Sequence, residues 1–289
     1  LGAAGTSTNG TDYGSLSSIT VSAGATTGTA NFTPTDDSIY EGNETAVISI
    51  SSVSGADAAE SGSQSVTITI TENDSSPTIT LATSATSIAE NAGSSLTLTA
   101  TSSIAADEDI TVTITTSGTG TEGTDYGTIS DITISAGATT GTVSFTPTDD
   151  NIYEGNETGI VAIDSVSGAD AAESGSQSVT ITITENDSSP TITLATSATS
   201  IAENAGSSLT LTATSSIAAD EDITVSISTS GTGTEGTDYS TISDITISAG
   251  ATTGTATFTP TDDSVYEGNE TGIVAIDTVS GGSATEDGT

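Results

Sequence analysis

The chain has 289 residues, including 39 acidic side chains and no Lys, Arg or His, so its formal net charge is −39 at pH 7. No side chain can pair with phosphate, which excludes nucleic acid as a partner and argues against direct membrane insertion or binding to anionic lipid. Cys is absent as well, so neither disulfides nor Lys–Asn isopeptide bonds can form, and any crosslink has to be a bound metal.

Composition and pattern point in opposite directions. Leu, Ile, Val and Phe together make up less than about 20% of the residues, which at high net charge is typical of disordered chains. The apolar residues nevertheless alternate with Ser and Thr, as Leu96, Leu98 and Ala100 do. This period of two is the pattern of half-buried strands, so we predict a folded all-β protein. No long apolar stretch or signal segment occurs, and we expect a soluble piece from the interior of a longer chain.

A long repeat organises the sequence. Tyr40 recurs as Tyr153 and Tyr266, and this spacing of 113 residues is too long for a solenoid unit but fits one sandwich domain. We expect a partial domain at 1–75, a complete one at 76–188 and one lacking its last strand at 189–289. Either the chain is a window cut from a longer array, which we favour, or neighbouring molecules donate the missing strand to form a filament.

The complete copy predicts seven strands without helices between them. In chain order they are expected at Thr78 to Ala82, Ser95 to Thr101, Asp109 to Thr116, Asp131 to Ser135, Thr142 to Phe145, Thr158 to Asp164 and Gln177 to Thr184. Ala136-Gly137 followed by Thr140-Gly141 predicts a hairpin loop. Such a density of Thr- and Ile-rich strands indicates tandem seven-stranded antiparallel β-sandwiches.

Acidic residues gather in loops and at strand ends. In the complete copy these residues are Glu90, Asp125, Asp149, Asp150, Glu154, Glu185 and Asp187. The loops of a sandwich collect at two poles, so acids that are distant in sequence can meet there. Two unit charges about 4 Å apart repel by roughly 4 kcal/mol at a surface-like dielectric, so a cluster of this kind needs a counter-ion.

Calcium is the counter-ion that fits best. It accepts 6 to 8 oxygen ligands in forgiving geometry, whereas magnesium demands a tight octahedron. Zinc and iron usually bring His or Cys, and neither occurs. The alternative interpretation, in which the acids are only a solvated surface suited to a salty medium, stays open on spacing alone.

Four motifs of the complete copy are similar to the Calx-β family. They are Ala-Glu-Asn-Ala-Gly (Ala89 to Gly93), Gly-Thr-Asp-Tyr (Gly123 to Tyr126), Phe-Thr-Pro-Thr-Asp-Asp-Asn-Ile-Tyr-Glu-Gly-Asn-Glu-Thr (Phe145 to Thr158) and Val-Thr-Ile-Thr-Ile-Thr-Glu-Asn-Asp (Val179 to Asp187). They follow the family's order, cover the whole repeat and recur wherever the chain extends far enough.

The resemblance implies an immunoglobulin-like sandwich that binds calcium at one pole, as in the regulatory domains of sodium/calcium exchangers and in many bacterial surface proteins. The ligands that it implies across the three copies are Asp12, Asp36, Asp37, the carbonyl of Ile39, Glu41, Glu72, Asp74, Glu90, Asp125, Asp149, Asp150, the carbonyl of Ile152, Glu154, Glu185, Asp187, Glu203, Asp238, Asp262, Asp263, the carbonyl of Val265 and Glu267. The sequence departs from the family at Glu185-Asn186-Asp187, where the best-studied members have a run of aspartates. The number of ions per domain is therefore open.

We expect no enzyme, because no His, Cys, Lys or Arg is present to act as a nucleophile or proton shuttle. Paired carboxylates can hydrolyse glycosides, but the repeats have few aromatic residues for sugar stacking. Tyr40, Tyr126 and Tyr153 are interpreted as aromatic caps of the sandwich rather than as a ligand platform. The Asp107-Glu108-Asp109 turn is interpreted as solvated.

The expected function is that of a calcium-binding repeat region in a large extracellular or cell-surface protein, forming a stiff structural or adhesive stalk. Its expected partners are calcium, neighbouring repeats of the same chain and, in a fibre, identical chains. Two alternatives remain: a calcium-sensing regulatory module and non-catalytic repeats of a larger surface enzyme. Near-identity of the repeats favours the stalk, because duplication lengthens a spacer whereas the copies of a sensor usually diverge.

Overall fold

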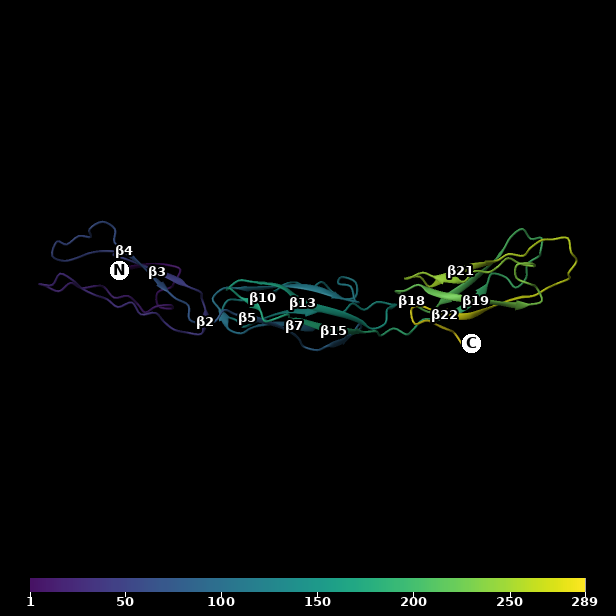
Figure 1. The fold of residues 1–289 in the computed structure, drawn as a ribbon, viewed down its shortest axis with the longest axis horizontal. Coiled ribbons are helices and arrows are strands. Elements are labelled where there is room, and N and C mark those ends of the chain that lie inside the picture. The colour runs from purple at the N-terminus through teal and green to yellow at the C-terminus, as the bar shows by residue number, and fades with distance from the viewer. Residues whose placement is uncertain (289) are drawn as a thin grey trace.

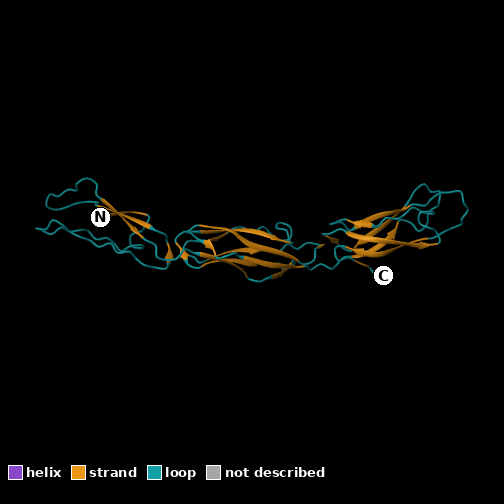
Figure 2. Ribbon diagram, in the orientation of Figure 1, coloured by secondary structure: helices purple, strands orange, loops and turns teal. Residues whose placement is uncertain are grey.

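The computed structural model describes residues 1–288, which form an elongated row of three β-rich bodies (Figure 1). None of the described residues lies in a helix (Figure 2), so the predicted all-β class is confirmed. Among these residues no helix is therefore long and apolar enough to span a membrane. The domain boundaries expected after residues 75 and 188 stay predictions, and Thr289 lies outside the described residues.

The middle domain contains all seven predicted strands and four short ones. Its strands are β5 (Thr78–Thr83), β6 (Ser87–Ala89), β7 (Leu96–Ser102), β8 (Ala105–Ala106), β9 (Ile110–Gly118), β10 (Ile132–Ile134), β11 (Thr140–Phe145), β12 (Ile152–Tyr153), β13 (Glu157–Ser167), β14 (Ala172–Glu173) and β15 (Ser178–Thr184). The four that were not predicted are β6, β8, β12 and β14. With only two or three residues each, they are too short to show an alternating pattern.

Two sheets of the middle domain enclose a single core. One has the order β10-β9-β13-β15-β6 and the other β11-β7-β5-β14. Most neighbours are antiparallel, while β6 and β14 add to the sheet edges in parallel. Ile79, Leu98, Val161 and Ile181 are fully buried between the sheets. Their alternation with outward Thr and Ser explains how a chain with few large apolar residues still folds as the predicted immunoglobulin-like sandwich.

The loop at Ala136-Gly137 does not make the predicted hairpin. Strand β10 pairs with β9 and β11 pairs with β7, so the chain crosses from one sheet to the other at this loop. Gly137 has a positive φ of 76°, and its N–H donates to the Ala106 carbonyl at 2.7 Å. The local turn signal was correct, but it carried no information about which sheet the next strand would join.

The flanking domains repeat parts of this plan. The first has β1 (Gly2–Gly5), β2 (Ile39–Tyr40), β3 (Glu44–Ser49) and β4 (Ser65–Ile70). The third has β16 (Thr191–Thr196), β17 (Leu209–Ser215), β18 (Ala218–Ala219), β19 (Ile223–Gly231), β20 (Ile245–Ile247), β21 (Thr253–Phe258), β22 (Gly272–Ser280) and β23 (Thr285–Glu286).

Short parallel pairs join each domain to the next. Strand β2 pairs with β8 at the first junction, and β12 pairs with β18 at the second. At the first junction the Tyr40 hydroxyl also donates to Asp170 Oδ2 at 2.9 Å. Tyr40 is 8% exposed, whereas its third-copy counterpart Tyr266 is 97% exposed. Each junction is therefore a defined backbone contact between two consecutive domains.

Gly141 provides a test of how closely the two sheets approach. A Cβ atom there would lie 2.3 Å from the Thr133 carbonyl oxygen, and Gly28 and Gly254 face the same backbone obstacle in the other copies. Gly141→Ala should therefore destabilise the middle domain by about 1–3 kcal/mol through overpacking. Ser144→Ala, on the exposed side of the same strand, should leave thermal unfolding unchanged. Equal melting temperatures for the two variants would show that the sheets can separate at no cost.

Candidate metal centre

A stacked pair of rings holds two acid-bearing loops together. Tyr126 directly follows Asp125, Phe145 ends the strand before Asp149, and the ring centroids lie 4.7 Å apart in the core. The Thr148 N–H donates to the Asp125 carbonyl at 2.9 Å, which joins the loops a second time. Local packing thus places Asp125 beside the Asp149-Asp150 pair, as the convergence argument predicted.

Glu90 and Glu185 bring the other two segments to the same pole. The Asp150 N–H donates to Glu90 Oε1 at 3.2 Å. Glu185 Oε2 accepts from the N–H groups of Glu154 at 2.7 Å and Gly155 at 2.9 Å. Its other oxygen accepts from the Asp187 N–H at 2.7 Å. Four segments that are far apart in sequence therefore meet through carboxylate-to-backbone hydrogen bonds.

The acids at this pole form a tight cluster. Asp125, Glu154 and Glu157 each present a carboxylate oxygen, and these oxygens lie within 4.8 Å of one another. Sequence reasoning identified the first two and missed Glu157. Gly155, with a positive φ of 74°, reverses the chain between Glu154 and Glu157, so that both side chains reach the same space. Two acids three residues apart with a glycine between them were the sequence signal that could have identified Glu157 as a member of the cluster.

The electrostatics of the cluster are unfavourable without a cation. Burial, followed by the charges of Asp125 and Glu157, raises the pKa of Glu154 to about 8. Burial and the same Asp125 raise the pKa of Glu157 to about 7. Burial also raises the pKa of Glu90 to about 7, with the charges of Glu185 and Asp150 adding to it. These carboxylates resist ionisation because no basic side chain exists in the sequence to pair with them.

Glu185 has a different part in the site. Burial raises its pKa, but hydrogen bonds from the backbone N–H groups of Asp187, Glu154, Gly155 and Asn186 outweigh burial, and its net pKa is lowered. It stays ionised and holds two loops in place. Asp187 Oδ2 is buried and has no hydrogen-bond partner among the described residues, which leaves it free to bind a metal.

The first domain repeats the cluster with Asp12, Glu41 and Glu44, whose ligand oxygens again lie within 4.8 Å. Glu44 is only 9% exposed, and its Oε2 is buried without a hydrogen-bond partner among residues 1–288. A buried, unsatisfied carboxylate oxygen is costly unless a ligand occupies the space before it. Together with an all-oxygen donor set, this fits calcium.

Asn73 shows the effect of the departure from an aspartate run. Its side-chain Nδ2 donates to Asp36 Oδ1 at 2.9 Å, while its backbone N–H and that of Asp74 donate to Glu72 Oε1. The amide therefore supplies a donor to a predicted ligand where an aspartate would have added another negative charge.

The third domain brings its acids together at the surface. Two groups there share Glu267: one is Glu203, Asp263 and Glu267, and the other is Asp238, Glu267 and Glu270. The Asp263 N–H donates to Glu203 Oε1 at 3.0 Å. Glu270, like Glu157 and Glu44, was not predicted. Asp262 is exposed and lies outside both groups, as Asp149, Asp36 and Asp37 lie outside the groups of their domains.

The carbonyls of Ile39, Ile152 and Val265 stay predictions. Ile39 and Ile152 begin the short junction strands β2 and β12, and Val265 lies in the corresponding loop of the third domain. The N–H of each donates to the aspartate two positions earlier, Asp37, Asp150 or Asp263. Each turn is thereby closed by its own aspartate, which orients the loop but leaves the ligand role of the carbonyl oxygen untested.

Asp107 does not behave as an isolated surface acid. Its side chain is exposed, as expected for the Asp107-Glu108-Asp109 turn, but the turn lies at the first domain junction. Burial there, together with the charges of Glu108, Asp12 and Glu72, raises the pKa of Asp107. The sequence interpretation of a merely solvated turn is therefore incomplete, because it considered one domain at a time.

The tyrosines divide between core and junction. Tyr126 is buried in the core, and Tyr40 is buried at the first junction with its hydroxyl on Asp170. Tyr153 occupies the second junction through β12. None of these three presents an open stacking face like that of Tyr266.

A family model described as the Calx-beta domain matches the chain three times, over residues 2–74, 72–187 and 185–287. No curated protein resembles the chain closely enough to count as a relative. Among solved structures, CBD12 from CALX1.2 is 18% identical, with 62% of this chain and 73% of that chain covered and a TM-score of 0.31. The bacterial integrin-binding protein invasin is 19% identical, with 87% and 45% covered and a TM-score of 0.27.

Glu157 provides a test of the cluster. Glu157→Gln removes one of three crowded charges. Above about pH 8, where Glu157 and Glu154 are ionised in the absence of metal, the change should stabilise the middle domain by about 1–4 kcal/mol, which is the repulsion between two charges about 4 Å apart in water and at a surface-like dielectric. The same change should weaken calcium binding by about tenfold or more. Thermal unfolding in chelator and calorimetric titration with calcium measure the two effects.

The control is Asp164→Asn, which removes one charge from an exposed position that accepts no hydrogen bond within residues 1–288. It should change neither the stability of the middle domain in chelator nor its affinity for calcium. If Glu157→Gln lowers stability in chelator and leaves calcium binding intact, the carboxylate is structural and the cluster is not a metal site.

Proposed function

Because the chain belongs to the Calx-beta domain family, we propose that it is a calcium-binding repeat region of a secreted or cell-surface structural or adhesive protein. In this proposal calcium occupies the acidic poles and stiffens the row of domains into a stalk or fibre. The observation that carries the proposal is the position of the carboxylate clusters, which lie next to the junctions between domains.

The donor chemistry supports calcium. Each cluster in the first two domains offers three carboxylate oxygens within 4.8 Å, and further acids lie at the same pole. Calcium takes several carboxylates together with carbonyl and water oxygens, and it tolerates irregular geometry. With no His or Cys in the sequence, a site for a softer metal has no basis.

The position of the clusters supports a mechanical role. Glu41 and Glu154 directly follow the strands that pair with the next domain. A cation that binds there removes repulsion at the point where two domains meet. Consecutive domains then hold a preferred angle, and a row of such domains becomes a stiff rod (Figure 1).

The proposed role is non-catalytic. The acidic loops repeat almost unchanged, Asp149 to Glu157 in the second domain and Asp262 to Glu270 in the third, as expected for duplicated spacer units. A regulatory calcium sensor is the second class, and copies that differed in their ligands would have favoured it. Proposed partners are calcium, neighbouring repeats and identical chains in a fibre, in an extracellular or cell-surface location.

The proposal predicts that calcium stabilises the fold. A ligand that binds only the native state adds about 2.7 kcal/mol per site at 100 times its dissociation constant. Thermal unfolding of the 289-residue chain should therefore shift upward by several degrees in calcium relative to chelator. Magnesium at equal concentration serves as the control and should shift it much less. Coincident melting curves in calcium and chelator would refute calcium as the ligand.

A further inference from the structure

The pairing at the first junction places acids from two domains side by side. In the parallel pair of β2 and β8, Tyr40 is opposite Ala106. The next residues are Glu41 and Asp107, and the Asp107 N–H donates to the Tyr40 carbonyl at 3.1 Å. The backbone contact that joins the domains thus brings a carboxylate of the second domain next to a cluster residue of the first.

The second junction repeats this arrangement independently. Tyr153 is opposite Ala219 in the pair of β12 and β18, and the Asp220 N–H donates to the Tyr153 carbonyl at 3.2 Å. Glu154 and Asp220 therefore occupy the places of Glu41 and Asp107. Because two junctions share the geometry, it follows from the repeat and not from one irregular loop.

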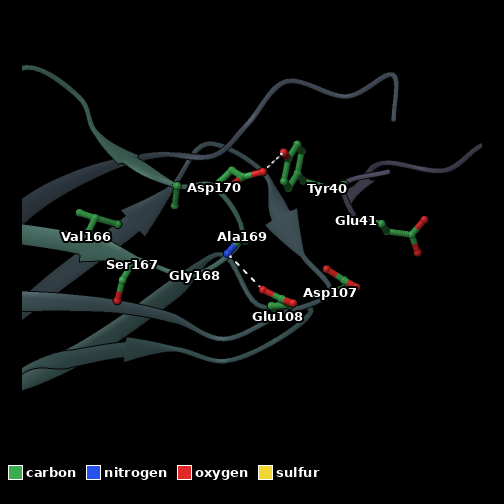
Figure 3. Close-up of a pocket in the computed structure, with 11 residues that line it drawn as sticks. Tyr40, Glu41, Asp107, Glu108, Val166, Ser167, Gly168, Ala169 and Asp170 are labelled. Atoms are coloured by element: carbon green, nitrogen blue, oxygen red, sulfur yellow. Dashed lines mark hydrogen bonds between the residues drawn. The ribbon is translucent and has the colours of Figure 1, made fainter. Parts of the chain in front are cut away.

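A cavity of about 470 Å³ lies at the first junction, between the domains. Glu41 and Gly42 line it from the first domain, and Asp107 and Glu108 line it from the second. Figure 3 shows these acids around it, with the hydrogen bond from Tyr40 to Asp170 beside them. The space between the domains is thus open and edged with carboxylates from both sides.

Glu44 supplies the observation that points to a ligand. It is 9% exposed, belongs to the cluster of Asp12 and Glu41, and its Oε2 has no hydrogen-bond partner among the described residues. Glu41 of the same cluster directly follows the strand that pairs with the second domain, next to Asp107. The unsatisfied oxygen therefore belongs to a cluster that reaches the junction and faces the acid of the following domain.

The carboxylates of Asp107 and Asp220 make hydrogen bonds only within their own turns among the described residues. Their backbone N–H groups make the junction contacts, and the carboxylate of Asp220 also accepts from the backbone N–H of the adjacent Glu221. The neighbouring Asp109 differs, because its Oδ1 accepts from the Ala136 N–H at 2.8 Å and closes the turn. Within this turn, Asp109 therefore stabilises the local backbone, whereas the Asp107 side chain is available at the junction.

We infer that Asp107 and Asp220 each contribute a carboxylate to the calcium site of the domain before them, so that one site is built by two consecutive domains. This inference rests on the proposed calcium-binding function. It assigns the coupling between domains to particular side chains: the metal binds both domains at once, and its release leaves like charges facing each other across the junction.

The test compares charge-matched variants of the full chain. Asp107→Asn/Asp220→Asn should weaken calcium binding at the first two clusters by about tenfold or more, the range typical for loss of a carboxylate that supports a metal site. The third cluster should bind as before, because no domain follows it in the 289 residues. The control Asp164→Asn/Asp277→Asn, with two exposed acids away from the clusters, should leave all sites unchanged.

A second measurement reports on the junction itself. Because the sequence has no cysteine, Thr142→Cys and Thr255→Cys, at exposed equivalent positions, can be spin-labelled specifically. Calcium should narrow the distribution of distances between the labels in the parent chain. Asp220→Asn should abolish most of this narrowing, even at calcium concentrations that saturate the site. The control variant Asp164→Asn/Asp277→Asn, which loses charge away from the junction, should keep the narrowing.

The outcomes separate this inference from the proposed function. If the parent chain binds calcium and the Asp107→Asn/Asp220→Asn variant binds it with the same affinity and the same narrowing, the inference is wrong and the proposed function stands. If the parent chain binds no calcium, both are wrong. Weaker binding together with a junction that stays broad supports the shared site.

Discussion

The structure depends on one electrostatic constraint, namely that carboxylates converge at the domain poles in a sequence without a single basic side chain. Stacked rings and backbone hydrogen bonds fix the loops that carry these acids, so the acids cannot simply move apart. Their pKa values rise toward neutrality because burial and mutual repulsion both disfavour the charged form. Only protons or a bound cation relieve that repulsion.

The repeat converts this local constraint into a property of the whole chain. Each cluster lies beside the strand that pairs with the following domain, so its charge state acts directly on the junction. Because the chain has few large apolar residues, two consecutive domains have little hydrophobic surface available to form a broad interface. A narrow backbone contact reinforced by a cation gives a defined geometry with little buried area, which suits a protein that gains length by duplication.

Sequence patterns predicted the strands and the acidic pole, which are determined within one domain. They did not predict the contacts that form where separate segments or domains meet. Alternation identified all seven main strands because burial on one sheet face forces a period of two. Convergence of Glu90, Asp125, Glu154 and Glu185 followed from the loop geometry of a sandwich. Glu157 was missed because it directly precedes the predicted strand Thr158 to Asp164 and its role depends on the turn at Gly155. The junction contact of Asp107 was not predicted because its backbone partner Tyr40 belongs to another domain, which no single-domain pattern contains.

Small-angle X-ray scattering of the chain during a calcium titration tests the central claim most directly, because it reports the stiffness of the row of domains in solution. At constant ionic strength, calcium should convert a flexible chain into a rigid rod whose largest dimension matches the extended row in Figure 1. Magnesium at the same concentration should leave the scattering close to that measured in chelator. Identical curves in calcium and chelator, or compact particles in calcium, would contradict the claim that cations at the acidic poles hold consecutive domains in line.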